Sequence, residues 1–109
     1  DLGESAVITT PEEHDKAVAL ISNLPLLVAQ ALCMNIKDNK LAQVLAASGF
    51  RDTTRLALSN IQMANDMVMI NRENIDESVE MLKMSLSKLL ESDYSVLAKS
   101  IKDFRETLY

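Results

Sequence analysis

The feature that most constrains the fold of this chain is a run of twenty residues, Ala17–Ile36, that contains no formally charged side chain. A helix of this length can span a bilayer. Polar side chains such as Asn23 and Gln30 are spread along it, however, and Pro25 lies near its middle. Polar groups at such positions suit a helix surrounded by protein better than one surrounded by lipid. We therefore expect no membrane partner and predict a long helix at the centre of a protein core, bent at Pro25 because proline removes a backbone hydrogen bond.

The start of this long helix is marked by the sequence Thr10-Pro11-Glu12-Glu13. Thr10 is a favourable N-cap, and proline is well tolerated at the first helical position. The Glu13 side chain is expected to return to Thr10 and complete a capping box. The helix is therefore predicted to begin at Pro11 and to continue to about Asn35.

Almost all of the sequence after this helix has the apolar spacing of amphipathic helices. A short helix from Leu41 is expected to end at Gly49, in the left-handed conformation common at helix C-termini. Further helices are predicted over Arg51–Leu58 and over Ile61–Arg72, the latter capped by Ser59-Asn60. A turn and cap at Glu91-Ser92-Asp93 separates two final apolar stripes, which are Ile75, Val79, Leu82, Leu86, Leu89 and Leu97, Ile101, Phe104, Leu108. The fold class is therefore all-α, a multi-helix domain with a long, proline-kinked central helix.

Chain length and the first nine residues define the domain organisation. With 109 residues the chain is long enough for one core of its own and too short for two domains. The run Ala6-Val7-Ile8-Thr9 favours a strand, although the sequence that follows is helical. Residues 1–9 are therefore interpreted as a linker or as the last strand of a preceding domain, and residues 10–109 as the helical domain.

Composition excludes several classes of site. The only two glycines are Gly3 and Gly49, so no glycine-rich loop is present that could hold a nucleotide phosphate. His14 is the only histidine and Cys33 the only cysteine, and neither has the spacing of a metal site. Cys33 is expected to be an inert core thiol and indicates a reducing, cytoplasmic location. The net charge of −5, without a basic stripe, argues against nucleic acid as a partner. Asp1 is not followed by a basic and apolar leader, so no signal peptide is expected.

Three formal charges interrupt an otherwise uncharged part of the chain. The segment Arg51-Asp52-Thr53-Thr54-Arg55 is both preceded and followed by ten uncharged residues. On a helix, Arg51 and Arg55 lie on one face, and Asp52 can orient the Arg55 guanidinium. Such a group can bind a small carboxylic acid in a secluded cleft, because the planar guanidinium matches a carboxylate with two hydrogen bonds. The alternative is a surface ion pair worth less than about 1 kcal/mol, and spacing alone does not separate the two.

Three motifs together resemble a known family. They are Thr10-Pro11-Glu12-Glu13-His14-Asp15, Ser22-Asn23-Leu24-Pro25-Leu26 and Ser48-Gly49-Phe50-Arg51-Asp52-Thr53-Thr54-Arg55, in this order. Residues 2–109 resemble the C-terminal helical domain of the prephenate and arogenate dehydrogenases of tyrosine biosynthesis. The third motif is the most specific, whereas the first two are weak signals when taken alone.

The resemblance implies an oxidoreductase of aromatic amino acid biosynthesis whose N-terminal Rossmann domain, not contained in this chain, binds NAD or NADP. The helical domain is then expected to form a homodimer and to complete the pocket for prephenate or arogenate. Arg55 is expected to bind the ring carboxylate of the substrate, with Asp52, Arg51 and Asn23 in supporting roles. The catalytic histidine of the family lies in the Rossmann domain. No catalytic, cofactor-binding or metal-binding residue is therefore expected in this chain, which is predicted to be inactive alone.

Two departures from the family pattern leave the substrate open. Many members have histidines at the positions of Asn23 and Leu26, and a tryptophan near Met63-Ala64. Hydrogen bonds from those rings cannot be made by Leu26 and would differ at Asn23. The sequence therefore decides neither between prephenate and arogenate nor between NAD and NADP.

Two other functions fit parts of the sequence. The first is a stand-alone helical dimerisation or interaction module without catalysis, which pairs through the stripe from Ile75 to Leu89. The second is an all-helical chorismate mutase, which acts on a related dicarboxylate. That enzyme needs several cations in one pocket, and the only arginines outside the charged segment are Arg72 and Arg105.

Overall fold

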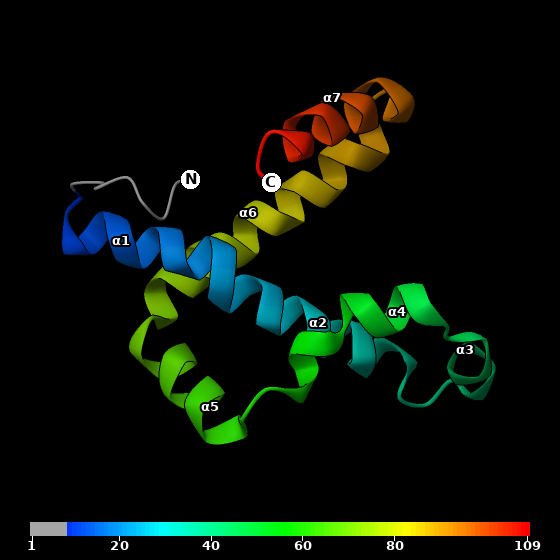
Figure 1. Ribbon diagram of the computed structural model, residues 1–109, viewed down its shortest axis with the longest axis horizontal. Helices are drawn as coiled ribbons and strands as arrows, with labels where there is room; N and C mark the ends of the chain where they lie inside the picture. The colour runs from blue at the N-terminus through cyan, green and yellow to red at the C-terminus, as the bar shows by residue number, and fades with distance from the viewer. Residues whose placement is uncertain (1–8) are drawn as a thin grey trace. The chain divides into compact units, whose positions relative to one another are not determined.

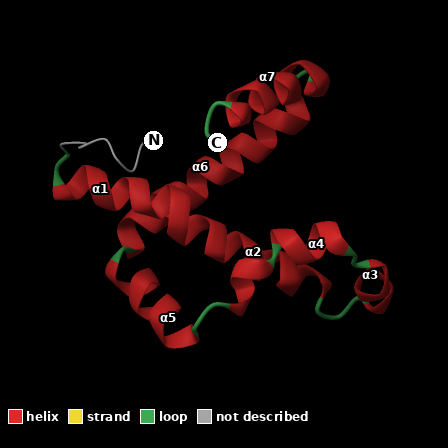
Figure 2. Ribbon diagram, viewed as in Figure 1, coloured by secondary structure: helices red, strands yellow, loops and turns green. Residues whose placement is uncertain are grey.

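The computed structural model describes residues 9–109, and this part of the chain contains helices and loops without any strand (Figure 2). The predicted all-α class is confirmed. The interpretation of residues 1–9 as a linker or strand remnant lies, except for Thr9, outside the described residues. The elements in chain order are α1 (Pro11–Val18), the π-helical segment η1 (Ala19–Asn23), α2 (Leu24–Ile36), α3 (Lys40–Leu45), α4 (Ser48–Thr53), the 3-10 segment η2 (Arg55–Leu58), α5 (Ile61–Ile70), α6 (Arg72–Glu91) and α7 (Tyr94–Glu106).

The long helix predicted from the uncharged run is present as α1, η1 and α2 in direct succession (Figure 1). The irregularity expected at Pro25 takes the form of the π-helical turn just before it. At the end of this turn the N–H of Leu24 donates to the carbonyl of Ala19, five residues earlier. Pro25 has no N–H, and its ring conflicts with the carbonyl four residues before it in a regular α-helix. A wider turn at this point relieves both problems without ending the helix.

Helix starts agree with the caps read from the sequence. The Thr10 hydroxyl accepts a hydrogen bond from the N–H of Glu13 at 3.1 Å. The Glu13 carboxylate does not return to Thr10 as the capping box predicted; it accepts from the hydroxyl of Thr9 at 3.3 Å. Asn60 and Asp93 cap α5 and α7 in the same manner, each accepting from the N–H three residues later.

The region around Gly49 differs from the prediction. The short helix α3 ends at Leu45, and Gly49 lies inside the next helix, α4, rather than in a left-handed cap. Among the described residues none has a positive φ. The helix predicted over Arg51–Leu58 is divided after Thr53 into α4 and η2. The hydroxyl of Thr54 bonds to the carbonyl of Phe50 at 2.7 Å, and such back-bonding at the last turn is typical of a helix that ends.

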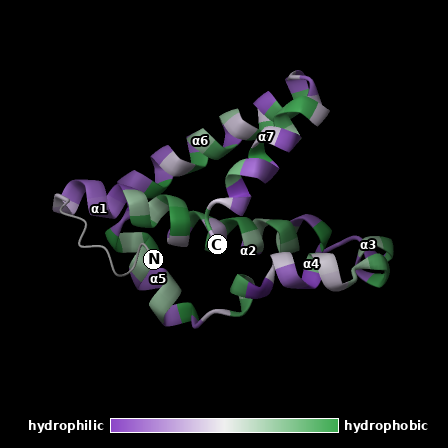
Figure 3. Cartoon of the chain, turned by 45° about the horizontal axis from the view of Figure 1, so that its top comes forward, coloured by the Kyte–Doolittle hydropathy of each residue, from purple (hydrophilic) through white to green (hydrophobic). Residues whose placement is uncertain are grey.

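The chain divides into two compact units, Asp1–Ser78 and Val79–Tyr109. All buried side chains of the described residues lie in the first unit. One face of the long helix supplies four of them, Ala19, Asn23, Leu26 and Ala29, and the others are Thr54, Ala64, Ile75 and Ser78. Within the long helix of this unit, α1 is mostly hydrophilic and α2 is mostly hydrophobic (Figure 3).

The helical run Pro11–Ile36 is long and apolar enough to cross a membrane by length and composition. Central helices of protein cores have the same character. The face that carries Ala19, Asn23, Leu26 and Ala29 is buried inside the first unit, but only 22% of the apolar window is buried, so within this chain the helix is less enclosed than predicted for a core helix.

The second unit is a helical hairpin made of the later part of α6 and of α7 (Figure 1). None of its residues is buried. The stripes predicted on these helices are only half-buried at Val79, Leu82, Leu89 and Leu97. Many large apolar side chains are exposed, namely Met81, Met84, Leu86, Leu90, Tyr94, Val96, Ile101, Phe104, Leu108 and Tyr109.

Candidate functional site

The charged segment lies at the junction of α4 and η2. Arg51 and Asp52 are in the last turn of α4, and Arg55 is the first residue of η2. Thr54, between them, is buried and anchors the junction, and η2 packs against α2. The three formal charges therefore lie at the end of α4 and the start of η2, and η2 packs against the long central helix.

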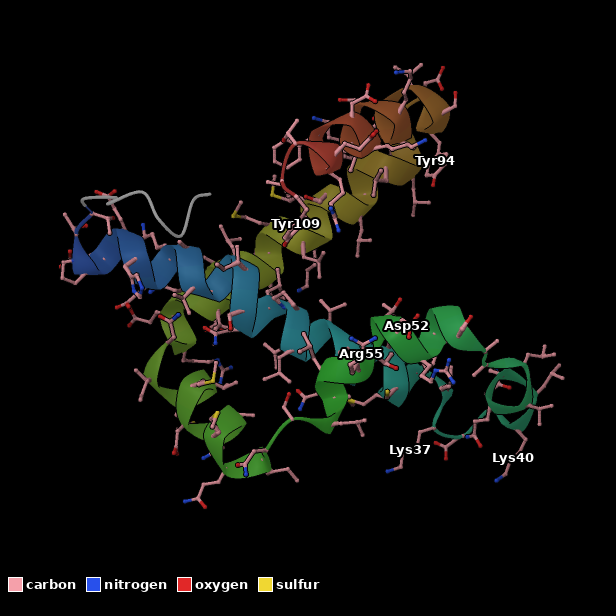
Figure 4. The ribbon with its side chains drawn as sticks, in the orientation of Figure 1. Lys37, Lys40, Asp52, Arg55, Tyr94 and Tyr109 are labelled. Carbon is pink, nitrogen blue, oxygen red and sulfur yellow. The ribbon has the colours of Figure 1, made fainter. Side chains whose placement is uncertain are left out.

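Arg55 and Asp52 form the ion pair predicted from their spacing. Arg55 Nη2 and Asp52 Oδ1 are 3.4 Å apart, and both side chains lie on the same short segment (Figure 4). The prediction that the guanidinium lies in a secluded cleft is not met within this chain, because 74% of the Arg55 side chain is exposed. An exposed ion pair of this kind contributes little stability.

Three of the predicted site residues line one concavity of about 400 Å³. Arg51, Asp52 and Arg55 contribute its polar edge, and the remaining lining residues are Cys33, Thr54, Ala57 and Leu58. Cys33 is only half-buried, so the prediction of a core thiol is wrong. Cys33 lies on α2, the helix against which η2 packs, and it lines the concavity together with Arg55.

Asn23, the fourth predicted site residue, does not line this concavity. It lies at the end of the π turn, where only 1% of the residue is exposed. Its Oδ1 accepts a hydrogen bond from Nδ2 of Asn71 at 3.0 Å. Both residues line a second concavity, of about 190 Å³, together with His14, Asp15, Val18, Met67 and Ile70.

Asn71 was not identified as a site residue from the sequence. Its one signal is the polar run Asn71-Arg72-Glu73-Asn74, which separates two apolar stripes. Such a run is typical of a loop between helices, and this one begins with the only residue between α5 and α6. The partner of Asn71 is 48 positions away, beyond the reach of any local pattern.

Metal ligands were not expected. Within residues 9–109 no group of three His, Cys, Asp or Glu side chains is close enough to hold a metal ion. Nδ1 of His14 lies 3.6 Å from the carboxylate of Asp15, and both side chains are largely exposed.

Comparison with known proteins identifies the family to which this chain belongs. The chain matches the family model of an all-helical dimerization domain over residues 10–108. That model describes the dimerization domain of prephenate dehydrogenase, and the chain belongs to this family.

Two curated relatives are both prephenate dehydrogenases. The protein of Bacillus subtilis is 32% identical over 110 residues, which cover 91% of this chain and 30% of the relative. The protein of Lactococcus lactis is 32% identical over 87 residues, which cover 76% of this chain and 25% of the relative. The chain therefore spans less than a third of the length of these curated relatives.

Two solved structures have the same fold. Synechocystis arogenate dehydrogenase superposes with a TM-score of 0.85 and 30% identity, over 99% of this chain and 44% of that protein. Prephenate dehydrogenase from A. aeolicus, solved in complex with hydroxyphenyl propionate and NAD+, superposes with a TM-score of 0.80 and 28% identity. That match covers 93% of this chain and 39% of the A. aeolicus protein. The architecture of the whole described chain is thus that of a domain from these two enzymes.

Proposed function

We propose that this chain is part of an NAD- or NADP-dependent dehydrogenase that acts on prephenate or arogenate in tyrosine biosynthesis. Membership of the dimerization-domain family supports the proposal. So do the relatives, of which one is a prephenate dehydrogenase and another an arogenate dehydrogenase. The cofactor is bound mainly by a Rossmann domain outside these 109 residues, and the chain alone is inactive. The A. aeolicus relative, solved with NAD+ and a hydroxyphenyl compound, supports this class of cofactor and ligand.

The proposed reaction is an oxidative decarboxylation. Hydride leaves the ring carbon that bears the hydroxyl group and reduces the nicotinamide. The hydroxyl proton passes to a base outside this chain, the ring carboxylate leaves as carbon dioxide, and the ring becomes aromatic. The role of residues 10–109 is to bind and orient the substrate and to form a homodimer.

Arg55 is the residue proposed to bind the ring carboxylate, with Asp52 and Arg51 beside it. The observation that carries this assignment is that all three charges line one concavity. A guanidinium that is exposed in this chain can be enclosed by a second domain or by a partner chain, and its attraction to a carboxylate strengthens when water is excluded.

The proposal is tested in the full-length protein by steady-state kinetics with prephenate and with arogenate. Arg55→Ala should lower kcat/KM by at least about 30-fold, because the substrate carboxylate loses its charged partner. Arg55→Lys should recover only part of the activity, since the ammonium cannot make the two-pronged contact. Lys40→Ala is the matched control, because it removes one exposed cation of the same unit (Figure 4). An unchanged kcat/KM for Arg55→Ala would contradict the assignment.

Cys33 provides a second test that does not depend on turnover. It lines the same concavity as Arg55, so bound substrate should slow its alkylation by iodoacetamide. The peptide that contains Cys33 is followed by mass spectrometry, with and without prephenate. Equal alkylation rates at saturating substrate would place the substrate elsewhere.

The exposure of Arg55 favours one other function, a helical dimerisation module without catalysis. In that case Arg55→Ala has no effect on any dehydrogenase assay. Under both functions the protein is a homodimer, which the family description and the exposed apolar side chains of the second unit support. We also propose a cytoplasmic location, without nucleic acid or membrane partners, as expected for an acidic chain with one free cysteine.

A further inference from the structure

Hydrogen bonds between three asparagine side chains link parts of the first unit that are distant in the sequence. Nδ2 of Asn71 donates to the backbone carbonyl of Asp15 at 2.9 Å and to Oδ1 of Asn23 at 3.0 Å. Oδ1 of Asn71 accepts from Nδ2 of Asn74 at 2.9 Å. The junction between α5 and α6 is thereby tied both to α1 and to the end of the π turn.

The backbone carbonyl of Asp15 fixes the direction of the hydrogen bonds between these asparagine side chains. A carbonyl can only accept, so Asn71 must turn its nitrogen toward Asp15. Both hydrogens of that nitrogen are then used, one for Asp15 and one for Asn23. Asn23 must therefore accept through its oxygen, and its own nitrogen is left as the group available to a ligand.

Nδ2 of Asn23 is a hydrogen-bond donor that has no acceptor among the described residues. Within residues 9–109 no acceptor is paired with it, and all fully buried side-chain nitrogens and oxygens of this part have partners. The nitrogen is therefore not completely enclosed, although only 1% of the residue is exposed. Asn23 lines the concavity of about 190 Å³, so its nitrogen is the free donor that a ligand in this concavity would meet.

We propose that Asn71 is a positioning residue that makes Asn23 a hydrogen-bond donor to an acceptor oxygen at the far end of the substrate, which would extend from the concavity of Arg55 to the one that Asn23 lines. The proposal rests on the proposed dehydrogenase function. Asn71 lines the same concavity, but both hydrogens of its Nδ2 are used for Asp15 and Asn23, so its effect on the ligand passes through Asn23. A side chain at position 23 that keeps one acceptor for Asn71 and one donor for the ligand preserves the arrangement, and one that offers only acceptors destroys it.

This rule gives opposite expectations for two substitutions at one position. Asn23→Asp can still accept from Asn71 but presents a carboxylate oxygen to the substrate. KM for prephenate or arogenate should rise at least tenfold, with the KM for NAD+ or NADP+ unchanged. Asn23→His retains one acceptor and one donor in the neutral ring. It should keep KM within about threefold of the wild-type value. A purely structural role for residue 23 does not predict this difference.

A third substitution tests Asn71 itself. Asn71→Asp removes both donors, so Asn23 must rotate to donate to the new carboxylate and then turns its oxygen toward the ligand. KM for the substrate should again rise at least tenfold, in a variant whose circular dichroism spectrum shows that it is folded. Asn65→Asp is the control, because it makes the same chemical change at an exposed position of α5. It should leave KM unchanged.

All assays use the full-length enzyme. A wild-type protein without activity on prephenate or arogenate refutes the proposed function. An active wild type whose KM is insensitive to Asn71→Asp refutes the role of Asn71, as does Asn23→His raising KM as much as Asn23→Asp. If Asn23→Asp fails to fold, the pair Asn71→Asp and Asn23→His still decides the outcome.

Discussion

The two units of this chain use their apolar residues in different ways. In the first unit the long central helix buries Ala19, Leu26 and Ala29, and other elements of the same unit supply Ala64 and Ile75. In the second unit no side chain is buried, although its two helices carry regular apolar stripes. Apolar spacing thus predicts which face of a helix is apolar, but not whether the same chain buries that face.

This difference is informative about assembly. Monomeric proteins rarely expose large contiguous apolar patches, and such patches usually mark interfaces. The second unit exposes 85% of Leu90 and 59% of Phe104. Since the family is named for dimerization, the second unit is the part whose stability we expect to depend on a partner chain.

The largest expected effect is the loss of core packing in the first unit. Ile75 is 2% exposed and is among the largest fully buried side chains. Ile75→Ala should lower the free energy of unfolding by about 2–5 kcal/mol, because a cavity replaces most of the side chain. Met84→Ala, at a side chain of the second unit that is 72% exposed, should change it by about 0.5 kcal/mol or less in the monomer. Urea denaturation of both variants, at a concentration low enough for the protein to be monomeric, provides the measurement, and equal losses would remove the contrast between the units.

The next effect concerns the dimer. Phe104→Glu places a charge in the α7 stripe and should weaken dimerisation at least tenfold, as measured by analytical ultracentrifugation of the full-length protein. Ser100→Glu adds the same charge at another exposed position of α7 and should leave the dimer intact. Equal dissociation constants for the two variants would show that the second unit does not pair through the Phe104 face.

The sequence predicted local features well because their causes are local. The caps at Thr10, Asn60 and Asp93 each join a side chain to the N–H three residues later, so the neighbouring sequence contains all the information. Pro25 likewise marked the position of an irregular turn, although not its π-helical form. Gly49 shows the limit, since a glycine permits a left-handed cap without requiring one.

The candidate site was predictable only in part. The spacing of Arg51, Asp52 and Arg55 indicated that these side chains lie together, and they line one concavity. The predicted burial of Arg55 is not met within residues 9–109, and a surface outside them that would cover it is described by no pattern inside this chain. The contact between Asn23 and Asn71 depends on how helices far apart in the sequence pack, so it follows from the fold alone.

A smaller effect distinguishes parts of the first unit. No residue of α1 is buried, so this helix depends on its cap more than the buried part of the long helix does. Thr10→Ala should lower the free energy of unfolding by about 1 kcal/mol. Thr9→Ala is the control, because within residues 9–109 the Thr9 hydroxyl bonds to the Glu13 side chain and the Thr10 carbonyl and caps no backbone N–H. A Thr9 variant as unstable as the Thr10 variant would show that the cap is not the cause.

The smallest expected effect lies at the start of α6, the helix that runs through both units. Arg72 Nε is 2.9 Å from Asp76 Oδ1. This hydrogen bond raises the pKa of the Arg72 guanidinium, and the negative charge of Asp76 raises it further. A raised pKa means that the pair stabilises the folded state below that pKa and loses this contribution only as pH rises through it. Arginine stays charged at all ordinary pH values. Arg72→Gln should therefore lower the melting temperature less than Thr10→Ala does, by the same amount at pH 6 and pH 9. Both side chains are largely exposed, so added salt should reduce the difference from wild type further. A loss that grew between pH 6 and pH 9, or that survived 1 M salt, would mean that Arg72 acts through a contact other than Asp76.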